Sequence, residues 1–123
     1  MPKTKVVFYR EDVGTVPVLD WLDTLPFKAQ DKCRVRIERL QELGHELRRP
    51  EGGYLRDGIY ELRVGLHGSN YRVLYFFHRQ VAVLAHGLMK ERVVPSVEIE
   101  KALRRKMKFE KDLKGHTYQE AVI

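Results

Sequence analysis

The chain has 123 residues, 43% of them hydrophobic, and a formal net charge of +6 at pH 7. This length suffices for one compact domain with one modest core, so we expect a single domain over residues 1–123. No run of about 18 apolar residues occurs, which excludes a membrane-spanning helix, and the excess of lysine and arginine indicates a polyanionic partner, usually nucleic acid.

The N-terminal part predicts one strand and two helices. Residues 4–9 read as a strand, and their apolar run is too short for a signal-peptide core, so we expect a cytoplasmic protein. Pro17 suits the first turn of a short helix that ends near Leu25. A second helix is predicted over residues 26–43, and Gly44 is placed to end it in a left-handed conformation. Its apolar stripe comprises Ala29, Cys33, Ile37 and Leu40.

Cys33 is the only cysteine of the chain. A single thiol forms no internal disulfide, which fits a reducing compartment. Because Cys33 lies on the apolar stripe of the second helix, a buried structural thiol is favoured over a nucleophile.

From residue 52 onward the hydrophobic period changes to two. Strands are predicted over residues 59–66, 71–78 and 81–87, with a tight turn at Arg79-Gln80. Short connections between consecutive strands are typical of an antiparallel meander.

Alternation along these strands assigns side chains to faces. Glu61 and Arg63 alternate with apolar residues, so they are expected on the opposite, open face of the sheet. Arg72 shares its face with apolar Leu74 and Phe76, which indicates that Arg72 is not simply a solvent-exposed residue.

A last helix is predicted from Pro95 to about Leu113. Residues 101–114 carry seven lysines and arginines against two acids, a density that favours a phosphate-contacting or acidic-partner surface. Residues 115–123 carry no clear pattern, and we expect a mobile tail there. The predicted buried stripe of the helix is Ile99, Ala102, Leu103 and Met107.

The predicted order is β-α-α-β-β-β-α. Helices at the ends of the chain and locally paired strands indicate the α+β class, with two N-terminal helices, one C-terminal helix and an antiparallel sheet. We expect the helices to cover one face of that sheet and to leave the other for solvent or a ligand.

The sequence contains no metal-site signature, no P-loop and no GxGxxG motif, so we expect no metal and no cofactor. Strand ends can bring Arg63, Arg72 and Lys90 onto one concave surface. Such a cluster of cations can hold a scissile phosphate and stabilise its transition state. The alternative is that each arginine pairs with Glu61, Glu91 or another acid and only supports the fold.

Four short motifs occur in a fixed order over these residues. They are Gly58–Arg63 (GIYELR), Asn70–Tyr75 (NYRVLY), Ala85–Lys90 (AHGLMK), and Pro95 followed by Glu98, Ile99 and Ala102. Together they resemble the RelE/ParE superfamily and look closest to its HigB-like, phage-derived branch. The resemblance covers most of residues 5–112 and implies the compact α+β fold of that superfamily.

The resemblance also implies a function. RelE and HigB members are toxins that cut mRNA on the ribosome without a metal, through attack of the ribose 2′-hydroxyl on the adjacent phosphate, and a cognate antitoxin neutralises them. By position, Arg63 and Arg72 would bind the phosphate, Lys90 would support charge or proton transfer, and His86 or Tyr71 would act as general acid or base. The expected RNA-binding residues are Arg56, Tyr71, Arg92, Lys101, Arg104 and Arg105.

The sequence departs from the family pattern at several positions. Leu88 replaces an aromatic residue, Glu91 replaces a lysine, and Val94 replaces a threonine that would cap the last helix. Residues 97–99 lack the tyrosine that acts in RelE catalysis. Two alternatives therefore stay open: a ParE-like inhibitor of DNA gyrase that cuts nothing, and a decayed module that binds nucleic acid or an antitoxin.

Overall fold

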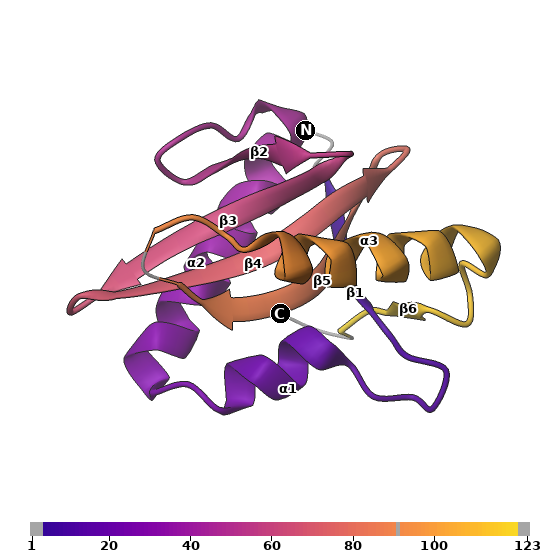
Figure 1. Ribbon diagram of the computed structural model, residues 1–123, viewed down its shortest axis with the longest axis horizontal. Coiled ribbons are helices and arrows are strands. Elements are labelled where there is room, and N and C mark those ends of the chain that lie inside the picture. The colour runs from indigo at the N-terminus through magenta and orange to yellow at the C-terminus, as the bar shows by residue number, and fades with distance from the viewer. Residues whose placement is uncertain (1–3, 91, 121–123) are drawn as a thin grey trace.

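The structure is a computed structural model that describes residues 4–90 and 92–120 (Figure 1). The described residues form three helices and six strands, with one 3₁₀ turn, Gly44–Glu46, after the second helix. The helices are α1 (Pro17–Asp23), α2 (Phe27–Leu43) and α3 (Ser96–Lys111). The strands are β1 (Lys5–Tyr9), β2 (Gly52–Arg56), β3 (Ile59–Leu66), β4 (Ser69–His78), β5 (Val81–Met89) and β6 (Thr117–Tyr118).

The six strands form one sheet in the order β2-β3-β4-β5-β1-β6. The predicted meander is its centre, where β3, β4 and β5 pair antiparallel. One pair is parallel, since β1 runs alongside β5 with Lys5 opposite Val81. The α+β class and the order of the predicted elements are confirmed, and β2 and β6 extend the sheet at its two edges.

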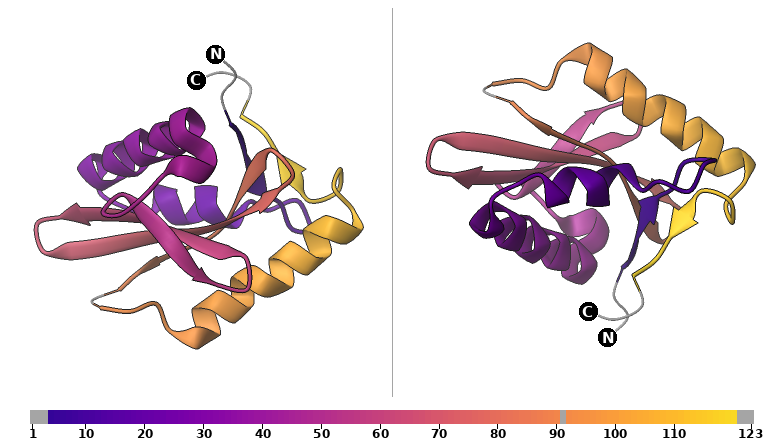
Figure 2. Two further views of the ribbon diagram at one scale, coloured as in Figure 1. Left: turned by 90° about the horizontal axis from the view of Figure 1, so that it is seen from above. Right: turned by 90° about the horizontal axis from the view of Figure 1, so that it is seen from below.

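Helices α1 and α2 cover one face of the sheet (Figure 2). The stripe predicted for α2 is buried there against β1, β3 and β5, together with Leu62, Val73 and Leu84. Cys33 is 1% exposed, and burial raises the pKa of its thiol to about 11. The prediction of a buried structural cysteine is therefore confirmed.

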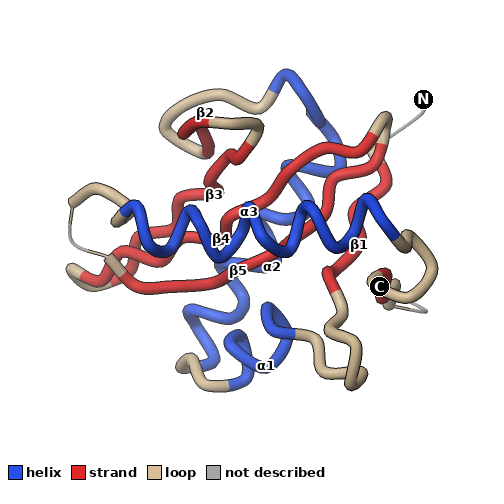
Figure 3. The backbone as a smooth tube through the Cα atoms, turned by 45° about the vertical axis from the view of Figure 1, so that its right-hand side comes forward, coloured by secondary structure: helices blue, strands red, loops and turns tan. Residues whose placement is uncertain are grey.

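Helix α3 covers part of the other face, where it crosses β3, β4 and β5 (Figure 3). Residues Ile59, Leu74 and Phe76 pack beneath it in a second core. The expectation of one open sheet face was wrong, because α3 carries its own apolar stripe and must bury it.

The stripe of α3 also differs from the prediction. Ile99 and Ala102 are buried as expected, but Met107 is 59% exposed and Phe109 is 3% exposed. A helix turns by about 100° per residue, so Met107 lies roughly 140° from Ala102, whereas Phe109 returns to within about 20° of it. The buried line thus continues from Ala102 to Phe109.

Residues 115–120, for which the sequence predicts a mobile tail, contact β1 in the structure. Thr117 and Tyr118 pair with β1, and the ring of His116 stacks on that of Tyr9 with centroids 5.3 Å apart. Nδ1 of His116 lies 2.8 Å from the carbonyl oxygen of Arg10 and donates to it. Residues 121–123 lie outside the described part of the chain. None of the helices in the described ranges is long and apolar enough to cross a membrane.

Candidate functional site

A cleft of about 270 Å³ opens between β2, β3 and the loop that precedes α3. Among the described residues, four arginines and one glutamate line it: Arg49, Arg56, Arg63, Arg92 and Glu61. Its apolar wall consists of Leu55, Val93, Val94 and Ile99. We call this site the arginine cleft. Its excess of cations over one carboxylate suits it to a phosphate or another anion.

The pleat of the sheet places two predicted residues together. Arg63 on β3 lies directly opposite Arg72 on β4 in the antiparallel register. Both strands direct these side chains to the face that α3 covers, as the alternation predicts. Two like charges directly opposite each other repel, so this pair needs a counter-charge nearby.

Glu61 supplies that counter-charge. Its Oε1 lies 3.1 Å from Nε of Arg72, and its Oε2 lies 3.8 Å from Nε of Arg63. Arg72 also donates from Nη1 to the carbonyl oxygen of Tyr71, 3.1 Å away. Burial lowers the pKa of the Arg72 guanidinium despite the opposing effect of Glu61. Arg72 is thus buried and paired, which agrees with the alternative that its ion pair supports the fold.

Contacts of Arg56 and Arg49 hold the rim of the arginine cleft in place. Nη2 of Arg56 donates to Oγ of Ser96, 2.8 Å away, and lies 4.0 Å from Oε2 of Glu100, so this arginine ties β2 to the first turn of α3. Arg49 was not predicted; its guanidinium packs against the backbone at Gly53. The sequence gives only a weak signal for Arg49, because the strand that follows it begins with two glycines, which have no side chains to show an alternating pattern.

Lys90 lies beside the arginine cleft, not in it. Its backbone N–H donates to the carbonyl oxygen of Asn70, 2.8 Å away. Its side chain lines a separate hollow of about 430 Å³ together with Gly68, Ser69, Asn70 and Met89. Asn70 precedes Arg72 by two residues on β4, a step of roughly 6.6 Å. The predicted cations therefore occupy two neighbouring sites.

Residues 20–107 match the family described as Phage derived protein Gp49-like (DUF891). The chain belongs to this family. The match runs from α1 into α3 and includes every residue that lines the arginine cleft. The family is a RelE-like, toxin-like module, so the predicted superfamily is confirmed at that level. None of the curated proteins compared with the chain matches it significantly.

In this Gp49-like protein, His86 is held by two partners. Its Nε2 lies 2.5 Å from Oε1 of Glu98, and Nη1 of Arg105 lies 3.2 Å from its Nδ1. Because a guanidinium only donates, Nδ1 must accept, and Nε2 therefore carries the proton that Glu98 accepts. Burial, assisted by Arg105, lowers the pKa of the imidazole. His86 is thus a neutral ring with both nitrogens occupied, and it does not line the arginine cleft.

The three predicted RNA-binding residues of α3 lie toward the β1 edge of the sheet. Lys101, Arg104 and Arg105 line a hollow of about 300 Å³ with Glu11 and Lys108. Arg105 is anchored there by a 2.7 Å bond to the carbonyl oxygen of Ala85 and by Glu11. The arginine cleft lies toward β2, at the other edge, so one phosphate cannot contact both groups.

Tyr71 belongs to the opposite sheet face. It packs in the α1/α2 core and meets the Trp21 ring edge-on, with centroids 6.3 Å apart. It follows that Tyr71 and Arg72, although adjacent in sequence, point to different faces. The described residues contain no group of histidine, cysteine or acidic side chains arranged to hold a metal ion.

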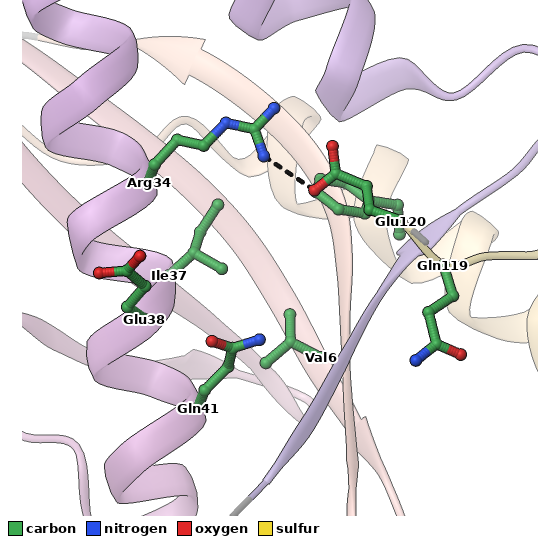
Figure 4. Close-up of a pocket in the computed structure, with 8 residues that line it drawn as sticks. Val6, Arg34, Ile37, Glu38, Gln41, Gln119 and Glu120 are labelled. Atoms are coloured by element: carbon green, nitrogen blue, oxygen red, sulfur yellow. Dashed lines mark hydrogen bonds and ion pairs between the residues drawn. The ribbon is translucent and has the colours of Figure 1, made fainter. Parts of the chain in front are cut away.

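A smaller cavity of about 100 Å³ lies between α2, β1 and the C-terminal segment (Figure 4). Nη1 of Arg34 reaches Oε1 of Glu120 across it at 2.8 Å. The lining also contains Val6, Ile37, Glu38 and Gln41. Its described lining carries two carboxylates, Glu38 and Glu120, against one arginine, so it does not favour anions as the arginine cleft does.

Proposed function

We propose that the protein is the toxin of a toxin–antitoxin pair, of the HigB-like kind, and that it cleaves mRNA on the ribosome at the arginine cleft. The observation that carries the proposal is the gathering of four arginines around a single buried carboxylate. Fixed cations in a partly enclosed cleft bind a phosphodiester and stabilise the added negative charge of its pentacoordinate transition state.

The cleavage we propose uses the RNA's own 2′-hydroxyl. Its oxygen attacks the adjacent phosphorus, the bond from phosphorus to the 5′-oxygen breaks, and a 2′,3′-cyclic phosphate and a 5′-hydroxyl result. Arg63 and Arg92 would hold the non-bridging oxygens, with Arg72 acting through Glu61 to fix Arg63. The 2′-hydroxyl loses a proton and the 5′-oxygen gains one, and we assign this transfer to Lys90 in the neighbouring hollow.

The antitoxin is expected to be a protein with an acidic segment. The hollow formed by Lys101, Arg104 and Arg105 offers charge pairing to such a segment. Binding there would neutralise the basic surface that also attracts RNA.

The test is a cleavage assay with purified ribosomes and a reporter mRNA, with mapping of new 5′ ends. Loss of a donor to the transition state commonly costs about 10²- to 10³-fold in rate, so Arg63→Ala and Arg92→Ala should reduce cleavage on that scale. Lys111→Ala removes an exposed cation at the far end of α3 and should leave the rate unchanged. Intact mRNA in the presence of wild-type protein that still arrests growth would rule the nuclease out.

One observation favours a second candidate function. The predicted acid–base residue His86 has both nitrogens engaged, and Arg72 is buried. The described lining of the arginine cleft contains no histidine, lysine or tyrosine, which suits a ParE-like toxin that binds DNA gyrase and cuts nothing. A gyrase supercoiling assay with the same variants separates the two candidates.

A further inference from the structure

Phe27, the first residue of α2, is 83% exposed. Its ring borders a hollow of about 390 Å³ between the start of α2 and the β3–β4 hairpin, which we call the aromatic hollow. The lining residues are Pro26, Phe27, Lys28, Leu66, His67, Ser69 and Tyr71. This exposed phenylalanine borders a concave site and leaves its aromatic face free for a ligand.

Three aromatic rings from separate parts of the fold line the aromatic hollow, namely Phe27, His67 and Tyr71. Tyr71 is buried and held by Trp21, so it forms a rigid floor. His67 lies in the hairpin turn with φ of 51° and is exposed, as Phe27 is. Lys32 joins α2 to β3 by donating to the carbonyl oxygen of Gly65 at 3.4 Å. These contacts hold the two sides of the hollow in place.

The charge around the aromatic hollow indicates what it binds. Lys28 is part of the lining, and none of the described residues that line it is acidic. Aromatic rings beside lysines are the combination with which proteins bind single-stranded nucleic acid, since bases stack on the rings and phosphates contact the cations.

The aromatic hollow borders the hollow that contains Lys90. Ser69, at the hairpin, lines both this hollow and the one that contains Lys90. Lys90 in turn precedes Arg92 of the arginine cleft by two residues. Lys90 thus has the aromatic hollow on one side, through Ser69, and Arg92 of the arginine cleft two residues further along the chain.

We infer that the aromatic hollow binds one unpaired nucleobase of the RNA strand whose phosphate lies in the arginine cleft, with the base stacked on Phe27. This inference rests on the proposed function, because it names a subsite for the same RNA. A protein side chain is the other possible occupant, but Lys28 and the neighbouring hollow that contains Lys90 favour RNA.

The test measures the Kd of a fluorescein-labelled single-stranded oligoribonucleotide by fluorescence anisotropy at low salt. Phe27→Ala removes the ring, Phe27→Leu keeps the apolar bulk without a π-face, and Phe27→Trp keeps the π-face. Stacking of one base predicts a Kd about 5- to 150-fold weaker for the alanine variant. We expect a clear loss for leucine as well, and wild-type affinity or better for tryptophan.

Two further variants make the result specific. Val35→Ala removes an exposed apolar side chain from the same helix and should leave the Kd unchanged. Arg92→Ala should weaken binding and also reduce the dependence of the Kd on salt. Phe27→Ala should weaken binding but leave that salt dependence unchanged. All Phe27 variants should keep the wild-type unfolding midpoint, since the side chain is exposed.

The outcomes separate the subsite from the function. If Arg92→Ala weakens binding but Phe27→Ala does not, the subsite is wrong and the proposed function stands. Wild-type RNA affinity in Phe27→Leu would overturn stacking of a base on Phe27. If Phe27→Ala lost antitoxin binding but kept its RNA affinity, the hollow would bind a protein side chain instead. A wild-type protein that binds no oligoribonucleotide would overturn the subsite, whereas the proposed function is overturned only by the absence of cleavage in the ribosome assay.

Discussion

Glu61 and Arg72 form a buried ion pair, with 3.1 Å between the carboxylate oxygen Oε1 and Nε. Each residue is only 5% exposed. The same carboxylate faces Arg63 at the wall of the arginine cleft. One buried acid thus neutralises the arginine below the cleft and orients the arginine that lines it.

We predict that Glu61→Gln strongly destabilises the fold. Removing one partner of a buried pair leaves the other charge buried and uncompensated, which costs about 3–5 kcal/mol. Urea unfolding should show a lower midpoint, whereas Glu42→Gln, which changes an exposed carboxylate of α2, should not. The double variant Glu61→Leu with Arg72→Met should recover most of the lost stability. A wild-type midpoint for Glu61→Gln, together with no recovery in the double variant, would show that the pair contributes little.

Phe109, and not Met107, should carry the stability that α3 gives to the second core. Phe109 is buried and meets the Phe76 ring edge-on, with centroids 5.5 Å apart. Phe109→Ala should lower the free energy of unfolding by about 3–5 kcal/mol. Met107→Ala removes an exposed side chain and should change it by no more than about 0.5 kcal/mol. Equal losses in the two variants, measured by urea unfolding, would contradict the observed stripe.

The sequence predicts those elements whose pattern is local. The stripe of α2 and the alternation of β3, β4 and β5 follow periods of 3.6 and 2, so their burial follows from sequence. The shared face of Arg63 and Arg72 follows from the same alternation. Strand β2 escaped prediction because Gly52 and Gly53 have no side chains with which to alternate, and β6 because it has two residues.

What the sequence could not predict depends on contacts between distant residues. His86 was expected in the active site, but Glu98 and Arg105, which come from α3, hold both of its nitrogens. Arg49 enters the arginine cleft only because β2 pairs with β3. No local pattern encodes either contact. The strand pattern does predict Arg63 on a concave surface, and Arg63 lines the arginine cleft, whereas its role there stays a prediction.

Gly87 should tolerate no larger residue. A Cβ atom at this position would overlap the indole ring of Trp21, which α1 places over β5. Gly87→Ala must therefore displace a large, packed ring, and overpacking of this kind typically costs about 1–3 kcal/mol. Gly65→Ala is the matched control, because a Cβ added at this strand glycine would make only an ordinary contact with Oδ1 of Asn70, 3.9 Å away. A lower thermal midpoint is expected for Gly87→Ala alone, and equal midpoints would show that Trp21 moves freely.

His86 should make the stability depend on pH. Burial lowers its pKa in the folded protein, whereas an unfolded histidine has a pKa of about 6.5. Below about pH 6.5 the unfolded chain therefore binds a proton that folded His86 resists, so stability falls as the pH falls. The lowered pKa of Glu98, held down mainly by its bond to His86, acts in the same direction but only at more acidic pH.

The measurement is the urea-derived free energy of unfolding at several values between about pH 7 and pH 5. His86→Gln retains an N–H for Glu98 but removes the titrating ring, so its stability should fall less steeply with acidification than that of the wild type. Val97→Ala, a neutral change in the first turn of α3, should keep the wild-type slope. Identical slopes for wild type and His86→Gln would mean that His86 is protonated as readily in the folded protein as in the unfolded chain. That result would contradict a neutral imidazole with both nitrogens hydrogen-bonded.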